Sequence, residues 1–275
     1  MLDGTDTGYT VELPIQGFDA PDYRETMYDK PGEDGSVLSS LFYGSRTITL
    51  TGHINAQATA AQYEALRRAL ASACAVQRDV NGQPKSSVIN VTTRGGSSYF
   101  LNVFPRKPTF DYEYATTSNF LLHFVSADSV IYGAGQISSG SIMRPTGGGF
   151  ILPFILPVAS ATTTGGSVTV ANSGNSTALP IVTLTGPLTN PYVQNSATGT
   201  FVQLNYTIPG GSFVMIDMAN KTVMLNGNST ILSTRTTDSD WWGILPGTNS
   251  ISLSTGSTSN TGNVVVSFYN AYSGV

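Results

Sequence analysis

Short segments rich in β-branched and aromatic residues recur through the second half of the chain. They are SVTVAN (167–172), LPIVTLTG (179–186), TFVQLNYTI (200–208), SFVMIDM (212–218), KTVMLNG (221–227), NSISLST (249–255) and NVVVSFYNAY (263–272). Turn residues separate them at intervals of about ten residues and no stretch has helical period, which predicts an antiparallel β-sandwich. A hairpin turning at residues 219–221 would place Met215 and Asp217 near Thr222 and Met224.

The first half mixes strand and helix patterns. RTITLTGHI (46–54) alternates cleanly, with Ile48, Leu50, Gly52 and Ile54 on one face, which predicts a half-buried strand. Further strands are expected in SSVINVTT (86–93), SYFLNVFPRKPTFDYEY (98–114) and NFLLHFVSAD (119–128). The half is therefore expected to be mainly β.

A single helix is expected, at residues 59–74. Thr59 and Gln62 have the spacing of an N-terminal capping box. The apolar stripe consists of Tyr63, Leu66, Leu70 and Ala73 or Cys74. We expect this stripe to pack against the sheet, with Cys74 as a buried packing residue.

Charge divides the chain into two regions. Residues 146–275 contain five of the thirty charged side chains, namely Asp217, Lys221, Arg235, Asp238 and Asp240. The junction MRPTGGGFILPFILPVASATTTGG is interrupted by glycine and proline, which is typical of a connection between domains. The sequence thus predicts an N-terminal domain at 1–145, a Gly/Pro-rich connection at 146–164 and a C-terminal β-sandwich at 165–275.

The overall composition limits the partners and the location. The net charge of −4 and the lack of clustered Lys and Arg argue against specific nucleic-acid binding. The N-terminus has no basic region before an apolar stretch, so we expect no signal peptide. The longest apolar run, FILPFILPVA at 150–159, is too short and too rich in proline to cross a bilayer, so no membrane insertion is expected.

Motifs for catalysis and cofactor binding are missing from the sequence. It contains no G-x-S-x-G, Walker, G-x-G-x-x-G or H-E-x-x-H pattern, so we expect no enzyme activity, no cofactor and no metal site. His53 and His123 lie on predicted strands, where a structural role is expected. Asp111 and Glu113 share a strand face and are the one candidate pair for a glycan hydrolase, although like charges also protect an edge strand.

Ordered motifs over nearly the whole chain resemble the distal tail protein (Dit) family of siphophages, the bacteriophages with long non-contractile tails. They are PGEDGSVLSSLFYGSRTITLTGHINA before the helix, GGGFILPFILP in the connection, and then SGNSTALPIVTLTGPLTNPYVQN, SATGTFVQLNYTI, IDMANKTVMLNG and LPGTNSI. In the first of these, the resemblance implies a strand pair around Tyr43, Gly44 and Arg46. It also implies a galectin-like or carbohydrate-module-like C-terminal sandwich.

The resemblance implies a structural virion protein at the distal end of the tail. Its N-terminal domains would form a hexameric ring that joins the tail tube protein to the tail-tip or tail-associated protein of the adsorption apparatus. DNA would pass through the lumen without specific binding, and a slightly acidic chain suits a lumen that must not hold phosphate. Such a protein is made in the host cytoplasm.

Four residues are candidates for contacts between subunits of such a ring, or alternatively for roles inside the fold. They are Tyr43, Arg46, Phe104 and Tyr112. Pro105 and Pro108 limit strand pairing in the aromatic segment 99–114, so a long bent hairpin or arm is expected there.

The segment DSDWWGILPGTNSI (238–251) contains both tryptophans. If it is extended, Trp241 and Trp242 point to opposite faces, so one is buried and the other is partly exposed. Asp240, Trp241, Trp242 and Asn249 are the candidate contacts to a glycan or a partner, since tryptophan stacks on sugars and amides or carboxylates bind hydroxyls. The alternative interpretation is that these rings plug the end of a sandwich.

Three functions remain open from the sequence. The first is the structural tail hub, and the second is a carbohydrate-binding accessory protein that contacts host-surface polysaccharide through the C-terminal sandwich. The third is a glycan hydrolase that would use Asp111 and Glu113. Fold resemblance alone does not transfer a sugar site, and the C-terminal half has no histidine.

Overall fold

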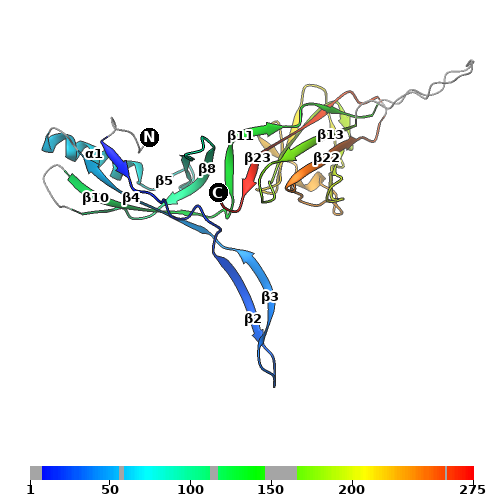
Figure 1. Ribbon diagram of the computed structural model, residues 1–275. Helices are drawn as coiled ribbons and strands as arrows, with labels where there is room; N and C mark the ends of the chain where they lie inside the picture. Colours follow the sequence, from blue (N-terminus) through cyan, green and yellow to red (C-terminus); the bar gives the residue numbers. More distant parts are fainter. Residues whose placement is uncertain (1–7, 56–58, 112–116, 146–165, 258) are drawn as a thin grey trace, which may run out of the picture. The chain divides into compact units, whose positions relative to one another are not determined.

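The computed structural model describes residues 8–55, 59–111, 117–145, 166–257 and 259–275. The chain divides into two compact units (Figure 1). Unit 1 comprises Met1–Tyr132 and the last three residues, Ser273–Val275, and unit 2 comprises Gly133–Tyr272. The fold is mainly β in both units, as the sequence predicts.

Unit 1 contains one described helix, α1, and an antiparallel sheet in the order β1-β4-β10-β8, with β7 on β8 and β9 on β10. The elements are β1 (Tyr9–Val11), β2 (Tyr23–Asp29), β3 (Ser36–Tyr43), β4 (Arg46–Asn55), α1 (Ala60–Ala73), β5 (Gln77–Arg78), β6 (Pro84–Lys85), β7 (Ser87–Thr92), β8 (Ser98–Pro105), β9 (Thr109–Phe110) and β10 (Thr117–Ser126). β2 pairs only with β3, and β5 only with β6, among the described residues. β11 (Ile131–Ser138) leads into unit 2.

The predicted helix and central strand form where their patterns indicate. The Oγ1 atom of Thr59 accepts a hydrogen bond of 3.3 Å from the backbone N–H of Gln62, which caps α1. Tyr63 and Leu70 are buried on the stripe. In β4 every second side chain is buried, so the alternation read from the sequence defines the core face.

Gly52 in β4 is required by a close approach of three strands. A Cβ atom at this position would lie 2.2 Å from the carbonyl oxygen of Thr10 in β1 and 2.5 Å from the ring of Phe120 in β10. Glycine therefore lets β1 and the Phe120 ring close over β4.

Unit 2 contains two larger antiparallel sheets whose alternate residues are buried, the arrangement of a sandwich, and a separate antiparallel pair of β15 and β18. One sheet has the order β23-β14-β19-β20-β21 with β12 on β23, and the other has the order β13-β22-β16-β17. The strands are β12 (Ile142–Met143), β13 (Ser167–Asn172), β14 (Ile181–Thr185), β15 (Leu188–Thr189), β16 (Tyr192–Asn195), β17 (Phe201–Gln203), β18 (Thr207–Ile208), β19 (Phe213–Asp217), β20 (Thr222–Leu225), β21 (Ser229–Thr230), β22 (Gly247–Ser254) and β23 (Asn263–Tyr272), with a short 3₁₀ helix η1 (Leu232–Thr234).

The hairpin predicted within unit 2 has the expected register. Met215 lies opposite Met224, and Asp217 lies opposite Thr222. Lys221 in the turn has a φ of 55°, and the Asp217 carboxylate accepts hydrogen bonds from the backbone of the turn. Local turn chemistry therefore fixes this register.

Three expectations about the organisation differ from the structure. The units divide at residue 132 and not at 145, because β12 pairs with β23 and thereby joins unit 2. The expected connection at 146–164 lies outside the described residues. The strand pair implied around Tyr43 and Arg46 is not formed, since β3 pairs with β2 while β4 pairs with β1 and β10.

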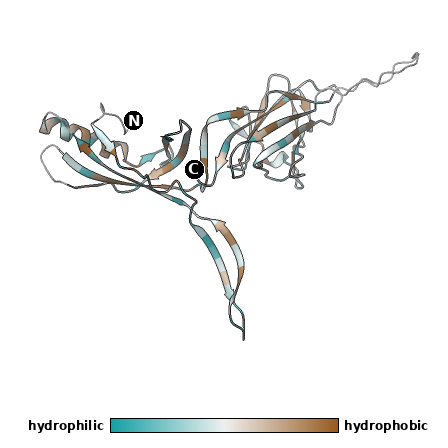
Figure 2. Ribbon diagram, in the orientation of Figure 1, coloured by the Kyte–Doolittle hydropathy of each residue, from teal (hydrophilic) through white to brown (hydrophobic). Residues whose placement is uncertain are grey.

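The expected arm also occurs at a different place. The segment 99–114 breaks at its prolines, but β8 and β9 both pair with β10 in the described sheet. The exposed hairpin of unit 1 is instead β2–β3 (Figure 1). Figure 2 shows that β3 is largely hydrophobic although it is exposed. We refer to residues 23–43 as the arm.

Candidate functional site

The tryptophan segment of unit 2 has one ring inside and one near the surface. Trp242 is 3% exposed and belongs to the core, whereas Trp241 is half-buried. Ile244 follows in the core and exchanges backbone hydrogen bonds with Ala178 at 2.7 and 2.9 Å. The sequence could not decide which ring turns inward, because both parities contain an apolar neighbour.

A cation covers Trp241. The guanidinium carbon of Arg235 lies 4.9 Å from the centre of the Trp241 ring, and the same guanidinium donates to the carbonyl oxygen of Ser239. Asp240 is exposed beside it, and its backbone N–H donates to the carbonyl of Phe201 at 2.8 Å. The guanidinium of Arg235 therefore occupies one face of the Trp241 ring.

Asn249 is completely buried, and its side chain forms hydrogen bonds to the backbone of the tryptophan segment. Its Nδ2 donates to the carbonyl oxygens of Leu245 at 2.7 Å and Gly247 at 3.1 Å. Its Oδ1 accepts from the backbone N–H of Leu245 at 3.0 Å and from Nδ2 of Asn195 at 3.1 Å. Asn195 is also fully buried and donates to Gly243 at 3.0 Å. The side chain of Asn249, a candidate contact residue, therefore stabilises the fold of this segment in the structure.

The two tryptophans are expected to respond differently to a fluorescence quencher. The variant Trp242→Phe retains only Trp241 and should be quenched readily by acrylamide, whereas Trp241→Phe retains only Trp242 and should be protected and emit at shorter wavelength. Steady-state quenching of both folded variants measures this. Equal quenching constants would contradict the assignment of Trp242 to the core.

Arg46 is 2% exposed and binds four backbone carbonyl oxygens of unit 1. Nη1 donates to Gly17 at 2.7 Å and to Asp19, and Nη2 donates to Ser129 at 2.9 Å and Ser273 at 2.7 Å. Burial lowers the pKa of this guanidinium, and the nearby carboxylates of Asp128 and Asp19 oppose the shift. Of its two open interpretations, the structure supports the role inside the fold.

The other three candidates for contacts between ring subunits lie in different parts of the chain. Tyr43 ends the arm, is 44% exposed and packs against Tyr23 with ring centres 5.4 Å apart. Phe104 is half-buried in β8 opposite Val125 of β10. Tyr112 lies outside the described residues. The structure does not bring the three together with Arg46.

Sequence reasoning missed a larger surface feature, the apolar side chains of the arm. Eight of them are at least 44% exposed. They are Tyr23, Met27, Tyr28, Val37, Leu38, Leu41, Phe42 and Tyr43. The signal was present in SVLSSLFY (36–43), whose apolar residues fall on both strand parities and so cannot all face one core.

The sequence also contains histidine, cysteine and carboxylate side chains that could take part in catalysis or metal binding. The ring Nδ1 of His123 lies 3.2 Å from the hydroxyl of Thr49 on the neighbouring strand. Burial raises the pKa of the Cys74 thiol. Asp111 is exposed, while its proposed partner Glu113 lies outside the described residues. Within the described ranges, no group of three or more His, Cys, Asp or Glu side chains could hold a metal ion.

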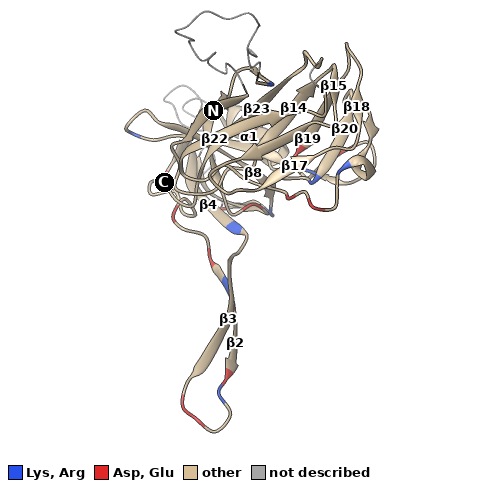
Figure 3. Cartoon of the chain, turned by 90° about the vertical axis from the view of Figure 1, so that its right-hand side faces the viewer, with Lys and Arg blue, Asp and Glu red and all other residues tan. Residues whose placement is uncertain are grey.

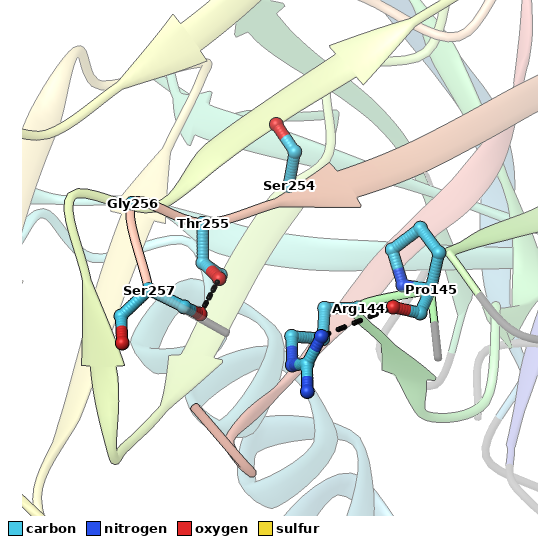
Figure 4. Close-up of a pocket in the computed structure, with 6 residues that line it drawn as sticks. All are labelled: Arg144, Pro145, Ser254, Thr255, Gly256 and Ser257. Atoms are coloured by element: carbon cyan, nitrogen blue, oxygen red, sulfur yellow. Dashed lines mark hydrogen bonds between the residues drawn. The ribbon is translucent and has the colours of Figure 1, made fainter. Parts of the chain in front are cut away.

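A shallow open depression of about 220 Å³ lies on unit 2 (Figure 4). It is lined by Arg144, Pro145, Ser254, Thr255, Gly256 and Ser257. The guanidinium of Arg144 donates to the carbonyls of Asn260 and Pro145, and the Thr255 hydroxyl donates to Ser257 at 3.0 Å. The side chains of Arg144 and Thr255 are thus both held by backbone carbonyl oxygens of this region.

No helix in the described part of the chain is both long and apolar enough to span a membrane.

Charged side chains are sparse over the strands, and several lie along the arm and in its loop (Figure 3).

The structure defines a mainly β protein with buried polar side chains that bind backbone groups and with an exposed apolar arm on unit 1. Residues 173–272 match the family model described as siphovirus-type tail component, C-terminal domain (SPP1_Dit). This stretch lies within unit 2 and is similar to siphovirus tail components, in agreement with the resemblance of the sequence to the Dit family. A search of curated proteins found no match.

Solved structures share the fold over nearly the whole chain. The SPP1 Dit (gp 19.1) protein, described as a paradigm of hub adsorption apparatus in phages that infect Gram-positive bacteria, is 13% identical, with a TM-score of 0.66 over 96% of this chain and 93% of that one. A chain of the phage P2 baseplate in its activated conformation with Ca is 10% identical, with a TM-score of 0.50 over 97% and 95%. At these identities the likeness establishes the fold.

Proposed function

We propose that this protein is the distal tail hub of a siphophage. Its subunits close into a ring, a hexamer, that joins the tail tube protein to the tail-tip protein of the adsorption apparatus and lets DNA pass. The main support for this proposal is the match of residues 173–272 to the siphovirus tail-component domain. The fold also matches the SPP1 Dit hub protein over 96% of this chain. On this proposal the protein acts in the virion, at the far end of the tail, and catalyses no reaction.

The charge of the chain fits a passage for DNA. A lumen that holds phosphate would slow ejection, because each Lys or Arg that neutralises a phosphate adds binding energy through counterion release. The net charge is −4 and charged residues are 11% of the chain. The most deeply buried cation, Arg46, is committed to backbone carbonyls and is not available to phosphate.

Oligomer mass and particle shape test the ring. We expect the purified full chain at high concentration to reach about six times the mass of one chain, because heterologous contacts that close form a cyclic assembly. Light scattering coupled to size exclusion measures the mass, and negative-stain images should contain annular particles. A strict monomer at every concentration, together with virions that lack the chain at the tube's end, would contradict the proposal.

A second candidate function is glycan contact through the C-terminal sandwich, favoured by the half-buried Trp241 beside the exposed Asp240. Host-surface polysaccharide would stack on the open side of the ring. Binding that is lost in Trp241→Ala but kept in Thr237→Ala, a nearby exposed position, would support it. Unchanged binding in Trp241→Ala, or no binding by the parent chain, would exclude this site.

A further inference from the structure

Unit 1 is built from two pieces of the chain, because unit 2 is inserted within it. The chain leaves unit 1 after Tyr132 and re-enters it at Ser273, with all of unit 2 between these two residues. We refer to residues 273–275 as the returning segment. Its contacts with unit 1 join parts of the protein that are far apart in the sequence.

One nitrogen atom of Arg46 binds both the departing chain and the returning segment. Its Nη2 donates to the carbonyl oxygen of Ser129, shortly before the departure, at 2.9 Å and to that of Ser273 at 2.7 Å. Its Nη1 donates to the carbonyl oxygens of Gly17 and Asp19. Since a buried charge is costly unless hydrogen bonds compensate it, each of these four acceptors stabilises the guanidinium. The fourth acceptor reaches Arg46 only when the returning segment is in place.

The rest of the returning segment contacts the same part of unit 1. The backbone N–H of Val275 donates to the carbonyl oxygen of Phe18 at 3.0 Å. A Cβ atom on Gly274 would lie 3.1 Å from the backbone nitrogen of Ala20 and 3.1 Å from the carbonyl carbon of Asp19. The lack of a side chain at residue 274 therefore lets the two backbones approach each other closely.

The departing chain has further contacts that form without the returning segment. The carboxylate of Asp128 accepts a hydrogen bond of 3.0 Å from the backbone N–H of Val130 and another from the hydroxyl of Tyr132. The rings of Tyr132 and Phe100 stack with centres 5.4 Å apart. All of these residues precede unit 2 in the chain. Within unit 1, the contacts of the returning segment are therefore the last to become available as the chain is made.

We propose that closure of the returning segment onto Arg46 is the step that completes unit 1. Unit 1 reaches its full stability only in a chain that has passed through unit 2, because the acceptor on Ser273 and the donor on Val275 arrive last. The consequence for assembly rests on the proposed function. If unit 1 builds the ring, a subunit becomes competent for assembly only after this closure, and so only with unit 2 attached.

A double-mutant cycle in the full chain tests whether Arg46 and the returning segment act together. Gly274→Val places a branched side chain where a Cβ atom alone already meets backbone atoms at 3.1 Å, and Arg46→Met removes the donors. The matched control is Gly95→Val, also in unit 1, where the nearest atom to an added Cβ is the hydroxyl of Thr93 at 3.9 Å.

Two measurements separate the two units. Hydrogen exchange of the β4 amides reports on unit 1, since Arg46 begins this strand. Tryptophan emission reports on unit 2, because Trp241 and Trp242 both lie there. Gly274→Val is expected to speed exchange of the β4 amides at least about 10-fold and to leave the emission unchanged. Gly95→Val should change neither.

The double variant Arg46→Met with Gly274→Val should exchange within about threefold of the faster single variant, because both substitutions prevent the same closure. Effects that multiply in the double variant would show independent roles and overturn the inference. It also fails if the β4 amides of Gly274→Val exchange like those of Gly95→Val. Should Gly274→Val not fold, Val275→Pro, which removes the donor to the Phe18 carbonyl, takes its place in the cycle with the same expected results.

Light scattering over a concentration series distinguishes failure of this inference from failure of the proposed ring. A parent chain that is monomeric at every concentration overturns the ring, whereas the exchange results still decide whether the returning segment completes unit 1. If the parent assembles, Gly274→Val is expected to assemble at least about 10-fold more weakly, because its competent state is only fractionally populated. Assembly equal to that of the parent, despite faster exchange, would overturn the link between closure and assembly.

Discussion

Replacing Arg46 with methionine is expected to lower the free energy of unfolding of unit 1 by about 3 kcal/mol or more. Methionine fills a similar volume but donates no hydrogen bond, so four backbone carbonyl oxygens lose their charged donor. One of these belongs to Ser273, and the backbone N–H of Val275, two residues later, donates to the carbonyl of Phe18 at 3.0 Å. Denaturant unfolding should show the loss, and hydrogen exchange should show earlier exposure of the last three residues.

The matched control for this substitution is Arg68→Met. Arg68 forms an exposed ion pair of 2.8 Å with Glu64 one turn earlier in α1, with side chains 80% and 62% exposed. Such a surface pair contributes little, so the change should stay within about 0.5 kcal/mol. If Arg46→Met were as stable as Arg68→Met, the hydrogen bonds of the buried guanidinium would not contribute to the stability of unit 1.

Replacing Asn249 with leucine is expected to lower the stability of unit 2 by about 2–4 kcal/mol. The amide makes four hydrogen bonds in a fully buried position, and leucine would remove the donor to the carbonyls of Leu245 and Gly247 and the acceptor of the Leu245 N–H and the Asn195 amide. The 238–246 segment should loosen with it. Thermal unfolding and the emission maximum of Trp242 report the two effects.

Thr248→Ala is the control for Asn249, because the threonine is adjacent and exposed. It should leave both readouts unchanged. A stable Asn249→Leu variant that loses only binding to a glycan or a partner would contradict this stabilising role and return Asn249 to the candidate contacts.

Periodicity in the sequence predicted the elements that bury one face. The alternation in residues 46–54 and the stripe in 59–74 became β4 and α1, and each predicted run of the second half contains a strand. The reason is that a buried face repeats at the period of the element, and this period is visible in one sequence.

The position of a polar residue in the alternation of a strand indicates whether it faces the core, whatever its side chain could bind. Arg46 has the same parity as Ile48 and Leu50, and Asn249 has the same parity as Ile251, so each lies on the core side. Both were candidates for contacts because their side chains can bind other molecules. Their position on the core face instead makes them donors to backbone carbonyl oxygens of neighbouring segments.

The sequence by itself determined that the chain is mainly β, where its helix lies, which strands bury which face, and, through ordered motifs, its resemblance to the distal tail family. Only the tertiary structure decided which tryptophan is inside, where the units divide, that the final residues return to unit 1, and that residues 23–43 form the arm. These depend on pairings between residues far apart in the sequence, such as β12 with β23 and Arg46 with Ser273. Local pattern specifies a face, but the partner of that face is chosen by the packing of the whole chain.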